Sequence, residues 1–271
     1  MPTAIAHVLS TSITIASRRI VTPDGMVAGS LQIEDGHIVD IATGGPPRGA
    51  IDWGSDLLIP GLVELHTDHL EPHFTPRPGV RWPPLAAVMA YDSQIAASGI
   101  TTVLDSLRVG GESADRITLD VATTLAGTID HARAAGLLKA DHKLHLRCEI
   151  CSSDVIEGTS EMLERHPALL ISLMDHTPGH RQFRDEEKLR AYYRSKHGRS
   201  DAELDRFFDE RRELHDRNSV PHRRALVAMA AERGVALASH DDTTLEHVAE
   251  SIRDGVRLAE FPTTHEAAEA S

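Results

Sequence analysis

Apolar and polar residues alternate in short runs along the first 56 residues, which is the pattern of β-strands that bury one face. The runs at 12–15, 30–33 and 37–41 alternate in this way, and stretches rich in Gly, Pro and Asp separate them as tight turns. Residues 1–56 are therefore predicted to form a small antiparallel β-sandwich layer, too short to stand alone.

From residue 57 onward the pattern changes to an apolar strand, a polar stop and a helix, repeated along the chain. Near-continuous apolar strands that alternate with helices indicate a parallel sheet with helices packed outside it. The predicted strands cover residues 61–65, 101–104, 144–150, 169–174, 235–239 and 256–260. The predicted helices cover residues 84–98, 114–135, 159–165, 221–233 and 245–253.

This α/β rhythm predicts a (β/α)8-type barrel over residues 57–271. A closed barrel of this type needs about eight strands, whereas the sequence carries about six, so we expect an incomplete barrel. Its exposed strand edges and apolar surface would favour poor solubility or pairing with a partner. A second copy of this chain is one such partner, which would give a homo-oligomer.

The stretch from Arg181 to about residue 220 breaks the rhythm, because it is highly charged and has few apolar positions. It predicts two inserted helices, at 185–197 and 201–218. One interpretation is a solvated helical hairpin with ion pairs between residues four apart. The other is a lid whose basic groups face the mouth of a site.

The composition is that of a folded globular protein, with 41% hydrophobic and 25% charged residues. The formal net charge of −13 argues against broad binding to nucleic acids or to anionic membranes. No apolar run approaches the ~20 residues of a membrane span, and the first residues lack a secretion leader. Two cysteines, Cys148 and Cys151, cannot make a disulfide framework, so a reduced, cytoplasmic protein is expected.

Cys148 and Cys151 also have the spacing of a metal or redox pair. No second pair of cysteines follows them, and a strand would hold the two side chains apart. The pair is therefore not interpreted as a functional site.

The strongest chemical signal is His66 with Asp68, at the end of the first predicted barrel strand. Residues two apart in a strand point to the same side, so the imidazole and the carboxylate project together. Such a pair is a common half-site for a borderline divalent metal such as Zn²⁺ or Mn²⁺. Barrels of this type carry their active sites at the carboxyl ends of the strands, where this pair is predicted to lie.

Further histidines and acidic residues end other predicted strands at the same level. Asp105, Glu149, His176 and His240 occupy such positions, and two aspartates follow His240. A single histidine at a strand end is usually structural. Because one ring of strand ends would bring several of these groups together, their recurrence predicts a metal site.

The loop at residues 71–83 follows His66 and Asp68 directly and contains four prolines with two arginines, Arg77 and Arg81. The prolines make the loop stiff, and a guanidinium group suits phosphate through paired hydrogen bonds. The loop is either a rigid surface loop or a phosphate clamp beside the metal.

Several motifs together resemble one family of the amidohydrolase superfamily, whose members are metal-dependent hydrolases on distorted barrels. They include Glu-Leu-His-Thr-Asp-His-Leu-Glu at 64–71, Pro-Arg-Pro-Gly-Val at 76–80, Asp-His-Thr-Pro-Gly at 175–179 and Glu-Phe-Pro-Thr-Thr at 260–264. They resemble the α-D-ribose 1-methylphosphonate 5-triphosphate diphosphatases of the carbon–phosphorus lyase pathway, over essentially the whole chain. The resemblance implies hydrolysis of a 5-triphosphate to a monophosphate and diphosphate during phosphonate catabolism.

The same resemblance implies a ligand set for one or two divalent ions, Zn²⁺, Mn²⁺ or Mg²⁺. The implied ligands are His66, Asp68, Glu149, His176 and His240. Such an ion lowers the pKa of bound water from ~15.7 toward ~7, and the hydroxide would attack the α-phosphorus while arginines balance the charge on the phosphoryl oxygens. The arginines expected to contact the triphosphate are, in order of preference, Arg77, Arg81, Arg181 and Arg184.

This sequence also departs from the family pattern, because it resembles only about the first two-thirds of a member. The last barrel strands of the family supply an aspartate that contacts metal and handles the proton of the attacking water. That residue is expected beyond residue 271, so no catalytic residue is assigned.

Two other hypotheses stay open beside the diphosphatase. One is an amide or cyclic-amide hydrolase of the same superfamily, and the other is an inactive, truncated fragment that binds only metal or a partner. The loop at 71–83 and the basic insert favour a phosphorylated substrate over an amide. The missing aspartate favours the inactive fragment.

Overall fold

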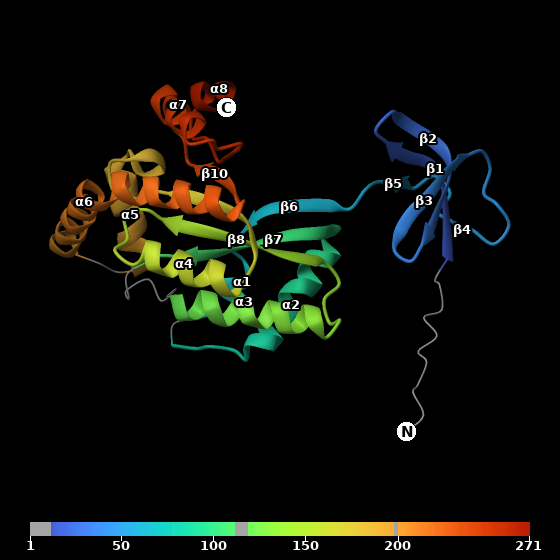
Figure 1. Cartoon of the computed structure of the whole chain (residues 1–271), viewed down its shortest axis with the longest axis horizontal. Coiled ribbons are helices and arrows are strands. Elements are labelled where there is room, and N and C mark those ends of the chain that lie inside the picture. The colour runs from blue at the N-terminus through green and yellow to red at the C-terminus, as the bar shows by residue number, and fades with distance from the viewer. Residues whose placement is uncertain (1–11, 78, 112–118, 198–199) are drawn as a thin grey trace. The chain divides into compact units, whose positions relative to one another are not determined.

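The computed structural model describes residues 12–77, 79–111, 119–197 and 200–271 (Figure 1). The chain divides into two compact units, Met1–Gly61 and Leu62–Ser271. Within the described ranges, no helix is both long and apolar enough to cross a lipid bilayer.

The first unit is built on a three-stranded antiparallel sheet. Its strands are β1 (Ser12–Thr22), β2 (Gly25–Glu34) and β3 (His37–Thr43), in the order β3-β2-β1. The predicted antiparallel layer is thereby confirmed. Two short strands, β4 (Ile51–Asp52) and β5 (Leu57–Leu58), add to β1 in parallel, which the alternation of apolar residues did not predict.

The second unit contains a six-stranded, fully parallel sheet in the order β11-β10-β9-β8-β7-β6. Its strands are β6 (Leu62–Thr67), β7 (Ile100–Val109), β8 (Asp141–Glu149), β9 (Ala168–Met174), β10 (Ala236–His240) and β11 (Leu258–Glu260). All six predicted strands are therefore present, and strands that are consecutive in the sequence pair with each other. The predicted incomplete α/β barrel of about six strands is confirmed.

Helices connect these strands and cover the outer face of the sheet (Figure 1). They are α1 (Leu70–Phe74), α2 (Pro84–Ala97), α3 (Leu119–Ala134), α4 (Val155–Arg165), α5 (Glu186–His197), α6 (Asp201–Arg233), α7 (Leu245–Arg253) and α8 (His265–Ala270), with a 3-10 turn at Arg181–Phe183. The main core lies between the sheet and α2, α3, α4 and α6, and contains fully buried Leu125, Ile129 and Leu146. The predicted start of the third helix, at residue 114, lies outside the described residues.

One prediction about the charged insert is wrong. The segments at 201–218 and 221–233 form a single helix, α6, with Pro221 inside it. A proline within a helix removes one backbone hydrogen bond and favours a break there. Here the helix continues as far as Gly234, whose positive φ of 67° ends it in the left-handed conformation that glycine adopts without strain.

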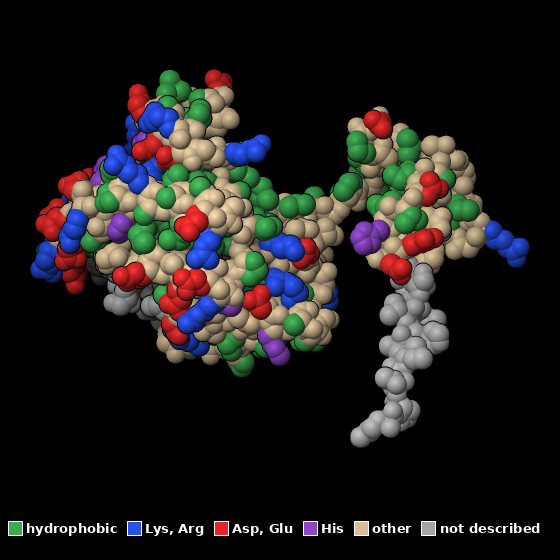
Figure 2. Space-filling view, in the orientation of Figure 1, with side chains coloured by type: hydrophobic (Ala, Val, Ile, Leu, Met, Phe, Trp, Pro, Cys, Tyr) green, Lys and Arg blue, Asp and Glu red, His purple; other side chains and the backbone are tan. Residues whose placement is uncertain are grey.

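The helical hairpin of α5 and α6 has a small apolar core of its own. Leu189 from α5 packs with Leu204 and Phe208 from α6, and all three are buried. Ion pairs such as Arg190 with Asp205 join the two helices, and Figure 2 shows acidic and basic side chains interspersed over this region. The hairpin is thus held by packing and by ion pairs between helices as well as by pairs along one helix.

The prediction that a strand ends at Asp105 is also wrong, because β7 continues to Val109. Asp105 is buried in mid-strand on the helix-covered side, where its Oδ2 lies 2.9 Å from Nδ1 of His142. Nε2 of the same imidazole lies 3.2 Å from Oδ1 of Asp92 on α2. Burial alone would lower the pKa of His142, but the two carboxylates outweigh it and raise that pKa. Asp105 therefore belongs to a buried charge cluster outside the barrel interior.

Candidate metal centre

The inner face of the parallel sheet changes from apolar to polar along the strands. Toward their amino ends, Leu104, Leu170 and Ala238 pack together with Leu258 on that face. Alternate residues of a strand share a face, so the following inward positions on these strands stack above this apolar floor. They carry the polar groups of the candidate centre.

His145 on β8 forms the first polar layer above the floor. Its Nε2 lies 2.9 Å from Oγ of Ser172, and its Nδ1 lies 3.0 Å from Oγ of Ser106 and 3.0 Å from the carbonyl oxygen of Leu65. Burial, helped by the neighbouring His66, lowers the pKa of His145 to about 3. The imidazole is therefore neutral at physiological pH and supports the groups above it without adding charge.

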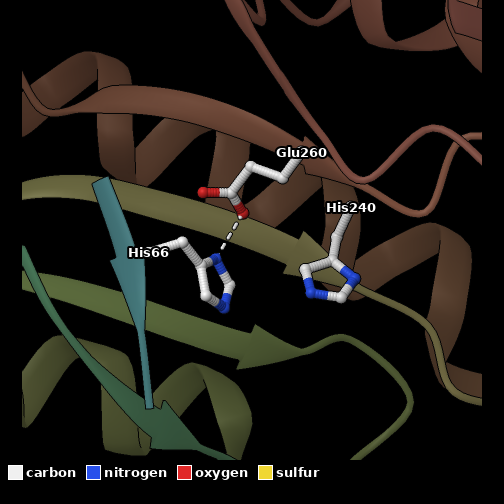
Figure 3. A group of neighbouring side chains, drawn as sticks. All are labelled: His66, His240 and Glu260. Atoms are coloured by element: carbon white, nitrogen blue, oxygen red, sulfur yellow. Dashed lines mark ion pairs between the residues drawn. The ribbon is translucent and has the colours of Figure 1, made fainter. Parts of the chain in front are cut away.

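Above His145, His66 lies close to His240 and Glu260, which come from the other end of the sheet (Figure 3). Nδ1 of His66 lies 2.9 Å from Oε2 of Glu260, and the ring centroids of His66 and His240 are 5.4 Å apart. The His66 ring also stands at 89° to that of His145, with centroids 4.9 Å apart. His66, His240 and Glu260 each present a ligand atom within 4.8 Å of the other two.

A second group of possible ligands adjoins the first. The carboxylate of Glu149, at the end of β8, lies 2.8 Å from Nδ1 of His176. The rings of His176 and His240 have centroids 5.4 Å apart, and Oδ2 of Asp241 lies 3.9 Å from Nε2 of His176 and 3.0 Å from Nδ1 of His240. His176, His240 and Asp241 again place one ligand atom each within 4.8 Å of one another.

Several of these buried polar atoms lack a hydrogen-bond partner among the described residues. They are Nδ1 of His66, Nδ1 of His240, and both carboxylate oxygens of Asp241 and of Glu260. The close approaches of His66 to Glu260 and of His240 to Asp241 are ion-pair contacts without hydrogen-bond geometry. Buried polar atoms are almost always satisfied, so a cluster of unsatisfied imidazole nitrogens and carboxylate oxygens needs an additional partner. This donor set fits a divalent cation, and His240 belongs to both groups.

The local electrostatics agree with such a cluster. Burial would raise the pKa of Glu149, but the adjacent His176 outweighs it and lowers that pKa, so the carboxylate is ionised. Burial lowers the pKa of His240 despite the neighbouring Asp241, which favours a neutral imidazole. Ionised carboxylates and neutral imidazoles are the forms that bind metal.

The backbone turns sharply just after two of these residues. Asp241 follows His240 and has a φ of 56°, and Phe261 follows Glu260 and has a φ of 54°. Positive φ is strained for residues other than glycine and is concentrated at functional sites. The Phe261 ring closes over the group, with its centroid 4.9 Å from that of His66.

Asp68 stands apart from these two groups. Its side chain is exposed, and its Oδ2 lies 3.1 Å from Nη1 of Arg147 on β8. Arg147 and Arg108 are mostly buried, with side chains 13% and 15% exposed. Nη2 of Arg108 lies 3.8 Å from Oε2 of Glu149. Two cations thus stand beside the candidate ligands on the inner face.

The four arginines predicted to contact a triphosphate occupy two kinds of environment. Arg77, Arg81 and Arg184 are exposed. Arg181 is 5% exposed, and its Nη1 lies 2.5 Å from Oδ1 of Asp242. Its Nη2 lies 3.4 Å from Oε2 of Glu250. The guanidinium of Arg181 is therefore held in place by two carboxylates.

Sequence reasoning missed Glu260, Asp241, His145 and Arg147 as members of the site. Glu260 ends the last strand and Asp241 follows the ligand candidate His240, so the strand-end pattern contained a signal for both. His145 and Arg147 precede Glu149 by four and two residues on one strand, so the two-residue period of a strand could have placed them on its inner side.

Comparison with known proteins gives matches in sequence and in structure. Residues 13–54 match the family model described as "Allantoinase, composite domain". The chain is 42% identical over 257 residues to α-D-ribose 1-methylphosphonate 5-triphosphate diphosphatase of Escherichia coli (strain K12), covering 93% of this chain and 67% of that protein. It is 33% identical over 98 residues to allantoinase of Arabidopsis thaliana, covering 34% of this chain and 18% of that protein.

Two solved structures cover nearly the whole chain. A crystal structure of D-hydantoinase matches 92% of it with 16% identity and a TM-score of 0.44. Guanine deaminase from C. acetobutylicum with bound guanine matches 93% of it with 12% identity and a TM-score of 0.43. The chain spans 57% of the hydantoinase chain and 68% of the deaminase chain.

The incomplete α/β barrel, its strand-end histidines and the sequence matches together define a member of the amidohydrolase superfamily. The 42% identity over most of the chain identifies the family within that superfamily. The chain belongs to the α-D-ribose 1-methylphosphonate 5-triphosphate diphosphatase family, a family of hydrolases.

Proposed function

We propose that this chain hydrolyses the 5-triphosphate of α-D-ribose 1-methylphosphonate 5-triphosphate and releases diphosphate in phosphonate catabolism, with a divalent cation in the candidate centre. The observation that carries the proposal is the meeting of His66, His176 and His240 with buried carboxylates on the inner face of the sheet. The E. coli relative, which bears the name of this diphosphatase, supports the choice of substrate.

The chain supplies ligands of two chemical kinds. His66, His176 and His240 offer imidazole nitrogens, and Glu149, Asp241 and Glu260 offer carboxylate oxygens. Asp68 stays a predicted ligand. A mixture of imidazole and carboxylate suits Zn²⁺ or Mn²⁺ better than Mg²⁺, which prefers oxygen ligands. When bound, a divalent cation supplies Lewis acidity toward a phosphoryl oxygen and toward water.

The arginines near these ligands would orient the anionic substrate. Arg108 and Arg147 stand on the inner face beside Glu149 and Asp68, where they would bind the phosphoryl group that reacts. The exposed Arg77, Arg81 and Arg184 are proposed to bind the outer phosphates. Arg181 would have a positioning role. Its ion pairs with Asp242 and Glu250 would fix the loop after β9.

The amide-hydrolase alternative is supported by the match to the allantoinase composite domain. That match lies within the first unit and contains none of the candidate ligands. The match to the E. coli diphosphatase covers 93% of the chain. The phosphoanhydride is therefore the bond that we propose is cleaved.

The two cysteines are both free and buried, which suits a reducing compartment. We place the reaction in the cytoplasm for that reason.

An assay for diphosphate release tests the proposed activity. The purified chain, loaded in turn with Zn²⁺, Mn²⁺ or Mg²⁺, is given the ribosyl triphosphate, and hydantoin and allantoin are offered in parallel reactions. Release of diphosphate, lost in His240→Ala, supports the proposal. Ring opening of the amides without diphosphate release would identify an amide hydrolase. Bound metal with no turnover of any substrate would show a binding fragment.

A further inference from the structure

A second cluster of metal-ligating side chains lies outside the candidate centre. It consists of Cys151, two residues beyond the end of β8, Asp175, next after β9, and His215 in α6. Cys151 and Asp175 are 1% and 5% exposed, and His215 is half-buried. Three segments far apart in the sequence thus bring a thiol, a carboxylate and an imidazole together.

The distances within this cluster are those between ligands of one tetrahedral cation. Sγ of Cys151 lies 3.2 Å from Oδ1 of Asp175 and 3.7 Å from Nδ1 of His215, and that nitrogen lies 3.1 Å from Oδ2 of Asp175. Zinc binds sulfur at about 2.3 Å and nitrogen or oxygen at about 2.0–2.2 Å. Tetrahedral ligands at those bond lengths are separated by about 3.3–3.6 Å, which is close to the spacing observed.

We propose that Cys151, Asp175 and His215 bind a second, zinc-like divalent cation, separate from the one in the candidate centre. Binding forms a bond from the cation to the sulfur of Cys151, and the thiol proton leaves to solvent. Asp175 supplies a carboxylate oxygen and His215 supplies Nδ1. The set of one sulfur, one nitrogen and one oxygen ligand favours a borderline metal such as Zn²⁺ over Mg²⁺ or Ca²⁺.

The geometry argues against a nucleophilic triad made of the same three residues. In such a triad the imidazole joins the nucleophile through one ring nitrogen and the acidic group through the other. Here both the thiol and the carboxylate approach the same nitrogen, Nδ1 of His215. Ligands of one cation must all lie close to one another, as these three groups do. A proton relay would instead use both ring nitrogens of His215.

The cluster also has room for a fourth ligand. Asp175 and His215 line a cavity of about 470 Å³, together with His180, His247 and the exposed Arg224 and Arg253. Metal sites with three protein ligands and an open fourth position bind water or an exchangeable ligand. Arginine and histidine side chains outnumber the carboxylates of Asp175, Glu250 and Asp254 in the lining of this cavity. An anion is therefore the class of ligand that would fill that position.

The second cluster and the candidate centre use residues that are adjacent in the sequence, but no side chain belongs to both. His176 contacts Glu149 and His240, whereas Asp175, the residue before it, contacts Cys151 and His215. None of the ligands named for the candidate centre carries sulfur, so a metal–thiolate signal from this chain does not come from those ligands.

Titration of the metal-free protein with Co²⁺ tests this site without reference to activity. The expected result is a sulfur-to-cobalt charge-transfer band in the near ultraviolet that rises and then saturates as Co²⁺ is added. Cys151→Ser should abolish the band and reduce the bound metal by one ion per chain. Cys148→Ser is the matched control and should keep the band, because the Cys148 thiol contacts Thr159 on α4.

His215→Gln provides a second variant, which leaves both cysteines in place and should weaken the band at equal Co²⁺ concentration. Circular dichroism confirms that each variant is folded. A wild-type chain that binds Co²⁺ without the band would overturn the proposal. So would a band that survives in Cys151→Ser and disappears in Cys148→Ser. Diphosphate release measured on the same preparations would be unaffected by those outcomes, so failure here is separable from failure of the proposed function.

Discussion

Nδ1 of His66 lies 2.9 Å from Oε2 of Glu260, although these residues belong to β6 and β11, the two edge strands of a six-stranded sheet. Neighbouring strands are about 4.8 Å apart, so the edges of a flat sheet of this size would be separated by on the order of 24 Å. The contact therefore requires a strongly curled sheet. Curvature, rather than any single loop, brings the candidate ligands together.

We expect Glu260→Gln to weaken divalent-metal binding by on the order of 10–100-fold or more. Even a side chain that only hydrogen-bonds to a metal ligand contributes that much to metal affinity. Glutamine keeps the shape of the side chain and removes its charge. Metal affinity can be measured by competition with a chelator. Glu266→Gln, at an exposed position of α8, is the control and should bind metal like the wild type. Equal affinity in both variants would remove Glu260 from the ligand set.

His240 is shared by both groups of the candidate centre, so we expect His240→Ala to lower metal content more than removal of any other imidazole. Elemental analysis after dialysis against metal-free buffer gives the number of ions per chain. His265→Ala replaces an exposed histidine and should retain the wild-type content. A full complement of metal in His240→Ala would contradict the shared-ligand geometry.

Arg181→Ala should destabilise the fold by about 3–5 kcal/mol, because it leaves the buried carboxylate of Asp242 without its charged partner. Arg184→Ala, at an exposed position nearby, should change the free energy of unfolding by about 0.5 kcal/mol or less. Urea unfolding followed by circular dichroism measures both. If Arg181→Ala unfolds like the wild type but raises KM for the triphosphate, Arg181 is a substrate contact and its structural role is wrong.

The raised pKa of His142 makes the stability of the second unit depend on pH. A histidine that titrates above its ordinary value of about 6.5 stabilises the fold in full below that pH. That contribution is lost as the pH rises through the raised folded pKa. Above pH ~6.5 we therefore expect the wild type to lose stability more steeply than His142→Gln.

Urea unfolding of the two proteins at a series of pH values measures this difference. His131→Gln replaces an exposed histidine of α3 and should follow the wild-type curve. Parallel curves for wild type and His142→Gln above pH ~6.5 would show that the charge on His142 contributes nothing to folding.

The sequence predicted the elements of the second unit well because each signal was local. Apolar strand runs and glycines just beyond helices, such as Gly99, Gly136 and Gly234, are set by neighbouring residues. The six parallel strands follow from those signals. Pro221 misled the prediction for α6, because a proline signals a break although the packing of a long helix can tolerate one.

The candidate site was harder to predict because it depends on which side of a strand each residue faces. Asp105 looked like a strand-end ligand, but β7 runs four residues further and turns it toward α2 and His142. Glu260 was missed because its partner, His66, lies at the far end of the sheet in both sequence and strand order. Such contacts follow from curvature, which no local pattern encodes.

The sharing of His240 between two groups has a consequence for the sign of the charge that an approaching triphosphate would meet. Three carboxylates, from Glu149, Asp241 and Glu260, surround the three imidazoles, and imidazoles that bind metal are neutral. Arg108 and Arg147 add two positive charges beside this assembly, and Asp68 adds one negative charge. One divalent ion would therefore leave it near neutral, whereas a second ion would make it cationic. Occupancy by two ions would thus make the candidate centre attract phosphate esters.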